Sequence, residues 1–137
     1  MSNNFAYDLV MALVPGTIAG YYAGLLTAKQ AKFSALKSEA LRCVRSIDYI
    51  GDESRTDLHS TKRSEDLHLI ASELLQLKHR KAGEKLLAIS GEVANVVASC
   101  SMSNVPVQGV ISKIRFWQEQ IRALRPGLRF FVPWGQI

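Results

Sequence analysis

The pattern of apolar and polar positions divides the chain into two parts. Residues 9–28 carry no charged side chain, whereas apolar residues recur every three or four positions among charged ones from Lys29 onward. A helix of about twenty residues is roughly 30 Å long, the thickness of the hydrocarbon core of a bilayer. The pattern therefore predicts a transmembrane and oligomerisation helix over residues 1–28, followed by a cytosolic helical bundle with a short aromatic and basic tail over residues 29–137.

The helical period continues past the uncharged stretch without a linker, because apolar residues keep to one face: Phe33, Leu36, Ala40, Val44 and Ile47. Residues 51–62 are polar and rich in turn formers, so we expect a loop there. Further helices are expected from Ser64, over residues 84–100 and over residues 107–124, with Gly83 as a bend or stop. No alternation persists long enough to build a sheet. The predicted fold is all-α, a single N-terminal membrane-spanning helix continuing into a small cytosolic bundle of three to four helices.

Small residues occupy every fourth position of the uncharged stretch, namely Ala12, Gly16, Gly20, Gly24 and Ala28. Glycine destabilises an isolated helix, but helices in lipid associate where small side chains let their backbones approach. The stripe therefore predicts a homo-oligomer. Pro15 interrupts the backbone hydrogen bonding, and Tyr21 and Tyr22 lie deeper than an interfacial belt, which indicates shielding by protein.

The charged residues give the span an orientation. All 17 Lys and Arg lie at or after Lys29, and residues 1–28 contain only one charged residue, Asp8. Basic residues near a span stay on the cytoplasmic side, so we expect the inner (cytoplasmic) membrane, with the N-terminus outside and the bundle in the cytoplasm. A signal peptide begins with basic residues, whereas Ser2 and Asn3 precede this apolar run, so we expect the segment to be retained.

Several basic residues are candidates for contact with anionic lipid or another anionic ligand: Lys29, Lys32, Lys78, Arg80, Lys81, Arg125 and Arg129. An anionic leaflet attracts a basic domain that is tethered beside it, which makes the lipid bilayer the first expected partner. Nucleic acid or a nucleotide ligand at this basic surface is the alternative, and a protein partner is also open. The aromatic tail around Trp134 suits either the membrane interface or packing on the bundle.

Arg63 and His68 are the candidates for catalysis. Their spacing resembles the Arg-x4-His motif of the HEPN ribonuclease superfamily, whose helical and often dimeric domains cut RNA with a paired arginine and histidine. The resemblance covers six residues, and it implies that His68 acts as acid or base while Arg63 stabilises the phosphorane. The competing interpretation, which we favour, is a solvated helix N-terminus at which Glu65 and Asp66 complement the helix dipole.

The remaining residues that could bind a metal ion or take part in catalysis form no recognisable pattern, so we expect neither a metal nor a cofactor. Glu65 and His68 form a Glu-x-x-His pair, as in di-iron bundles, but the sequence lacks a second copy and His79 has no Glu three positions earlier. We expect the scattered histidines to be solvated surface residues. We expect Cys43 and Cys100 to act as small apolar side chains and to form no disulfide. Neither a phosphate-binding loop nor a nucleophile elbow is present, so an enzyme is not favoured.

The predicted function is that of a small membrane-anchored helical protein that self-assembles through its glycine-striped helix. Such an assembly would perturb the membrane or form a pore, a layout found among membrane effectors of antiviral defence. One alternative is a HEPN-like ribonuclease that uses Arg63 and His68. Another is a soluble helical oligomer, with the apolar helix buried at its centre, that binds nucleic acid or another protein.

Overall fold

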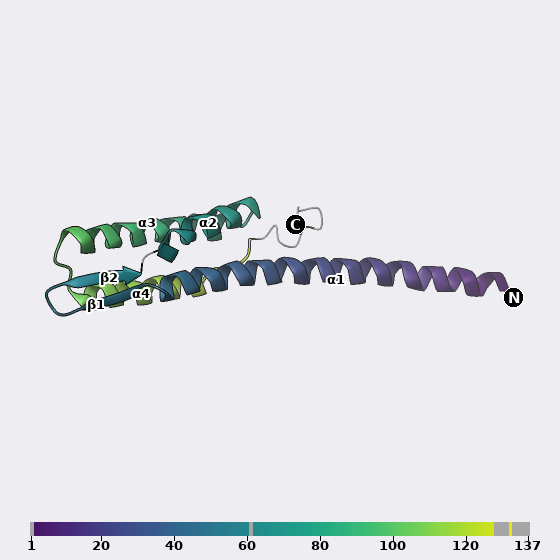
Figure 1. The fold of residues 1–137 in the computed structure, drawn as a ribbon. Coiled ribbons are helices and arrows are strands. Elements are labelled where there is room, and N and C mark those ends of the chain that lie inside the picture. The colour runs from purple at the N-terminus through teal and green to yellow at the C-terminus, as the bar shows by residue number, and fades with distance from the viewer. Residues whose placement is uncertain (1, 61, 128–131, 133–137) are drawn as a thin grey trace.

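Helices dominate the part of the chain that the computed structural model describes, which is residues 2–60, 62–127 and 132. The elements are helix α1 (Ser2–Arg45), strands β1 (Asp48–Gly51) and β2 (Thr56–Ser60), the 3-10 helix η1 (Lys62–Ser64), and helices α2 (Asp66–Gln76), α3 (Arg80–Met102) and α4 (Val107–Arg122). Figure 1 shows α1 as a long rod whose C-terminal end joins the other elements, while its N-terminal half projects away from them.

α1 changes character along its 44 residues. Residues 9–28 carry no charged side chain on any face, whereas the C-terminal third of α1 gathers its apolar residues on one face. That face is buried in the bundle, and it consists of Phe33, Ala40, Cys43, Val44 and Ile47. The helix runs unbroken through Pro15, so the predicted continuity between the apolar stretch and the bundle is confirmed.

One apolar core joins the end of α1 to α2, α3 and α4. Helix α2 lies against α3, and α1 contacts both α2 and α4. All four helices contribute fully buried side chains, among them Val44, Leu67, Leu74, Leu86, Val93, Trp117 and Ile121. Each large apolar side chain that leaves water contributes about 1.5–3 kcal/mol, so this core supplies most of the stability of the bundle.

The prediction of a loop over residues 51–62 is wrong, because a β-hairpin occupies most of this segment. β1 pairs antiparallel with β2, and Gly51 lies opposite Thr56. The Asp52 carboxylate accepts the backbone N–H groups of Ser54 and Arg55 at 3.3 and 3.2 Å, which closes the turn. The Thr56 hydroxyl donates to the carbonyl oxygen of Val105 at 2.8 Å and ties the hairpin to the α3–α4 connection. Strands of four and five residues are too short for alternation to reveal them.

The start of α2 and the corner between α2 and α3 also differ from the prediction. η1 occupies the position expected for the start of a helix at Ser64, and the break expected at Gly83 lies instead at Lys78, whose φ is 63°. The N–H groups of Lys78 and His79 donate to the carbonyl oxygens of Leu75 and Leu74 at 3.0 and 2.9 Å, a Schellman turn. Gly83 continues α3, where a Cβ would lie 2.6 Å from the Cγ of Leu75. This glycine therefore serves the close approach of two helices.

Candidate functional site

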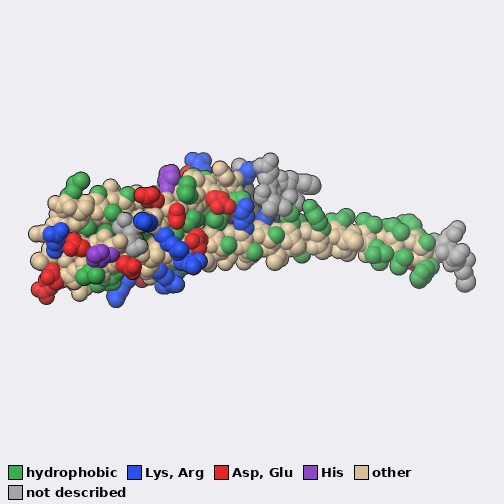
Figure 2. All heavy atoms as spheres, in the orientation of Figure 1, with side chains coloured by type: hydrophobic (Ala, Val, Ile, Leu, Met, Phe, Trp, Pro, Cys, Tyr) green, Lys and Arg blue, Asp and Glu red, His purple; other side chains and the backbone are tan. Residues whose placement is uncertain are grey.

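The N-terminal half of α1 is an exposed apolar surface. By length and composition α1 can cross a membrane, and none of its most apolar 18-residue window is buried. Several large side chains are at least half exposed: Leu9, Val10, Met11, Leu13 and Ile18. Figure 2 shows the projecting segment as largely apolar, in contrast to the mixed charges of the bundle. A core helix of a monomer would be buried, whereas this segment is exposed.

The small-residue face of α1, defined by Ala12, Gly16, Gly20, Gly24 and Ala28, is uncovered. A Cβ added at any of its three glycines would meet nothing within 4 Å, and both alanines are exposed. At 100° per residue these five positions share one broad side of the helix, and the opposite side holds Met11, Val14, Ile18 and Leu25. Leu9 and Leu13 also fall on this side of the helix, so a second helix could approach the backbone closely beside Gly16, Gly20 and Gly24.

The threonine hydroxyls in this part of α1 are satisfied within the helix. Thr17 donates to the carbonyl oxygens of Leu13 and Val14 at 3.0 and 2.9 Å, and Thr27 donates to that of Ala23 at 2.9 Å. A polar group that bonds within its own helix needs no water partner. Both threonines are therefore compatible with an apolar medium.

Three lysines lie where α1 enters the bundle, and each makes a contact within the chain. Lys29 donates to the carbonyl oxygen of Val132 at 3.3 Å, and the ammonium of Lys32 lies 3.7 Å from the Glu73 carboxylate. Lys37 donates to the carbonyl oxygens of Arg122 and Leu124, which are left unpaired at the end of α4. The sequence predicted lipid contact for Lys29 and Lys32, and it did not reveal that these lysines fasten α1 to the bundle.

The predicted basic residues of the bundle come together around one cavity. This basic pocket, of about 950 Å³, lies between the α2–α3 corner and the chain that follows α4. Five cations and one carboxylate contribute to its lining: Lys78, Arg80, Lys81, Lys85, Arg125 and Glu84. Arg80 is paired with Glu84 at 2.6 Å. Of the residues predicted for anion contact, Arg129 lies outside the described residues.

His79 is buried, which corrects the expectation that the histidines are solvated. Its ring packs edge-on against Phe33, with centroids 4.8 Å apart, and its Nδ1 accepts the N–H of Gly127 at 3.1 Å. Burial lowers the pKa of His79, and the nearby charge of Lys29 lowers it further. His79 therefore joins α1, the α2–α3 corner and the end of α4 at one point. In the sequence, His79 lies among basic residues at the break between two helices, so its burial could not be predicted.

The residues considered for catalysis and metal binding remain apart from these surfaces. Arg63 on η1 and His68 on α2 are both exposed. Among the described residues, no three His, Cys, Asp or Glu side chains are grouped so that they could hold a metal ion. Cys43 and Cys100 are buried and free, and burial raises the pKa of each thiol.

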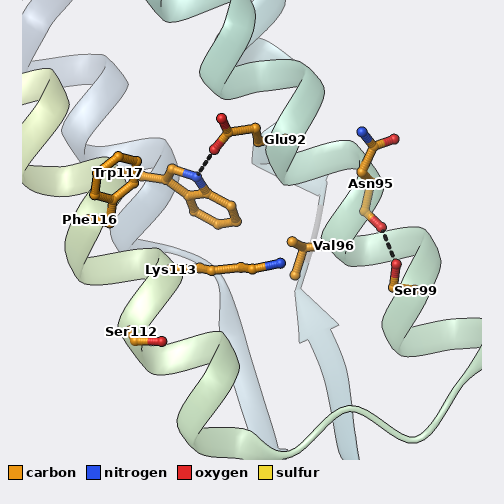
Figure 3. Close-up of a pocket in the computed structure, with 8 residues that line it drawn as sticks. All are labelled: Glu92, Asn95, Val96, Ser99, Ser112, Lys113, Phe116 and Trp117. Carbon is orange, nitrogen blue, oxygen red and sulfur yellow. Dashed lines mark hydrogen bonds between the residues drawn. The ribbon is translucent and has the colours of Figure 1, made fainter.

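A groove between α3 and α4, of about 520 Å³, was not predicted. It is lined by Glu92, Asn95, Val96, Ser99, Ser112, Lys113, Phe116 and Trp117. Figure 3 shows the Trp117 indole and the Lys113 side chain reaching from α4 toward α3. The indole N–H donates to the Glu92 carboxylate at 2.7 Å and so satisfies its only polar group. The sequence predicted a helix over residues 107–124, which contains Trp117, but not the pairing of this helix with α3.

The small-residue face and the basic pocket are thus the two surfaces on which a function can be argued. The first is presented by the projecting half of α1, and the second lies at the end of the bundle from which α1 emerges (Figure 1). The chain has no significant match to a protein family model, a curated protein or a solved structure.

Proposed function

We propose that this protein is anchored in the cytoplasmic membrane by α1, that it self-assembles through the small-residue face, and that the assembly perturbs or permeabilises the bilayer. The bundle lies in the cytoplasm, on the side of the basic residues. The observation that carries the proposal is that the projecting half of α1 contains a long apolar stretch that carries no charge over residues 9–28, and that none of its most apolar 18-residue window is buried in the described chain.

The energy of this exposed surface excludes a lone helix in water. Six large side chains, those of Leu9, Val10, Met11, Leu13, Val14 and Ile18, are each about half exposed or more. Full burial of such side chains is worth about 1.5–3 kcal/mol each, so at half exposure the six forgo roughly 5–9 kcal/mol in water. That amount is comparable with the whole stability of a small domain. The segment is therefore covered in its functional state.

Lipid covers this segment better than a soluble oligomer does. A helix at the centre of a soluble assembly turns its outer face to water or to its own domain, and that face is polar where water meets it. Here the face opposite the small residues carries Met11, Val14, Ile18 and Leu25, all apolar. Acyl chains cover such a face at no cost, while the small-residue face is left for protein contact.

The direction in which α1 joins the bundle favours the same assembly. At 100° per residue, the buried positions Phe33, Ala40 and Val44 point about 140° away from Gly20, the middle of the small-residue face. The bundle therefore lies on the side of α1 that faces away from Gly20. Copies of α1 can pack along their glycines with their bundles outermost, so the bundles do not obstruct the contact.

Hydroxyl groups in the span support permeation by such an assembly. Thr17 and Thr27 lie on the same side of α1 as the glycines, Tyr21 lies on the flank of that side, and Tyr22 lies on the opposite side. Polar side chains inside a membrane face the interior of an assembly or a water-filled path. A cluster of α1 helices packed along the glycines would collect the two threonine hydroxyls at its contacts.

The test is membrane association, assembly and leakage measured on the same variants. Wild type is expected to resist alkaline carbonate extraction, to give crosslinked multimers in membranes, and to release dye from vesicles. Gly20→Leu is expected to remain in the membrane but to lose both multimers and dye release, because a leucine separates the backbones. Val14→Leu enlarges a residue on the opposite face and serves as the control, with wild-type behaviour expected.

Two outcomes contradict the proposal. Recovery of wild type from the soluble fraction without detergent would refute the membrane anchor and favour the soluble oligomer. An unchanged crosslinking ladder in Gly20→Leu would refute assembly through the small-residue face.

A further inference from the structure

The basic pocket combines features that match one class of ligand. The charged residues of its lining carry a net charge of +4, since they are five cations and one carboxylate. Apolar residues also line it, namely Leu75, Ala82, Leu124 and Pro126. A phosphate that continues into a glycerol and an acyl chain has the same division into an anionic and an apolar part. Its volume, about 950 Å³, is large enough for a headgroup.

The depth of the pocket agrees with the depth of lipid headgroups. The predicted span ends at Ala28, and Phe33, which touches the His79 ring beside the pocket, follows five residues later. Five residues of helix rise about 7.5 Å. The headgroup layer on each side of a bilayer is roughly 5–8 Å thick, from the difference between the total and the hydrocarbon thickness. A span that leaves the hydrocarbon core at Ala28 therefore brings the pocket to headgroup level.

Hydrogen bonds and close packing hold the two walls of the pocket in place. The Schellman turn fixes the direction of Lys78 between α2 and α3, and the N–H of Gly127 donates to Nδ1 of His79 from the other wall. A Cβ at Gly127 would lie 3.4 Å from the carbonyl oxygen of Lys78, so the two walls are in contact. Ligands bind best where the site is formed in advance.

We propose that the basic pocket binds the phosphate-bearing headgroup of an anionic phospholipid of the cytoplasmic leaflet. This inference rests on the proposed function, because it needs α1 in the membrane to place the pocket. Lys81 and Arg125 approach the phosphate from the two walls, and the apolar residues of the lining receive the start of an acyl chain. The bundle is thereby held against the bilayer at a second point.

The experiment uses the full chain in a neutral detergent. Binding of short-chain phosphatidylglycerol, of short-chain phosphatidylcholine and of inorganic phosphate is measured by native mass spectrometry or calorimetry. The pocket variant combines Lys81→Glu with Arg125→Glu. The control combines Arg45→Glu with Arg115→Glu, which makes the same change in net charge at exposed residues that do not line the pocket.

Wild type and the control are expected to bind phosphatidylglycerol at least on the order of tenfold more tightly than either phosphatidylcholine or inorganic phosphate, while the pocket variant loses this preference. Equal weakening in both variants would overturn the proposal, because it shows attraction by overall charge. Inorganic phosphate that binds as tightly as the lipid would also overturn it, in favour of a free-anion site. The short-chain lipid reaches the pocket without a bilayer, and carbonate extraction of wild type tests the anchor separately.

Discussion

Acidification is expected to destabilise the protein through His79. Because Nδ1 accepts the N–H of Gly127, the neutral ring carries its proton on Nε2. A second proton would turn Nδ1 into a donor that faces another donor, close to the positive charge of Lys29. Burial and that charge therefore lower the pKa of His79 in the folded protein below its ordinary value.

The sign and size of the effect follow from this shift. Below the ordinary pKa of about 6.5 the unfolded chain binds a proton that the folded chain does not, so stability falls as the pH falls and is restored above that pKa. If the folded form stays neutral, moving from pH 7.5 to pH 5.5 costs about 1.4 kcal/mol, the free energy of protonating the unfolded imidazole. A folded pKa inside that range would make the loss smaller, so this figure is the upper bound.

Urea unfolding of the full chain in detergent, followed by circular dichroism at both pH values, measures this loss. His79→Phe is expected to be about 1–3 kcal/mol less stable than wild type at pH 7.5, since the N–H of Gly127 loses its acceptor. The part of the pH dependence that His79 supplies should vanish in this variant. His68→Gln, at an exposed histidine, is the control and should keep it. A pH dependence that is the same in His79→Phe and wild type would refute the reasoning.

Two further predictions concern the packing of α3. Gly83→Ala should destabilise the bundle by about 1–3 kcal/mol, because the added Cβ would lie 2.6 Å from the Cγ of Leu75. Gly91→Ala is the control: its Cβ would meet nothing within 4 Å, so this variant should be neutral or stabilised by up to about 1 kcal/mol. Equal melting temperatures for the two variants would contradict this prediction. Trp117→Phe should cost about 1–3 kcal/mol, since it removes the bond to Glu92 and opens a void, and Glu92→Gln, which keeps an acceptor, should cost less in the same urea titration.

The long elements of the fold could be predicted because each carries several turns of a regular period. α1 was recognised from the uncharged stretch and from the spacing of Phe33, Ala40 and Val44, and α4 from the face that buries Trp117. The hairpin depends instead on one side chain, Asp52, that closes a turn between two short strands. Local contacts of this kind leave no periodic signal.

The candidate sites were predicted to different extents for the same reason. The small-residue face lies on one helix, so spacing alone defines it. The basic pocket joins residues 78–85 to Arg125, and only the packing of α4 beside the α2–α3 corner brings them together. Gly83 misled the prediction because a glycine that permits helix packing looks the same in sequence as a glycine that ends a helix.

In the proposed membrane-anchored form, the unbroken course of α1 makes the span and the bundle a single lever. Its last third is embedded in the core, and Lys32 and Lys37 brace it against α2 and α4 where it enters. A membrane helix answers a change in bilayer thickness by tilting. With no hinge in α1, such a tilt carries the whole bundle with it, and the hairpin, at the end farthest from the projecting half (Figure 1), sweeps the widest arc. In that proposed form, a change in bilayer thickness would become a sideways displacement of the hairpin.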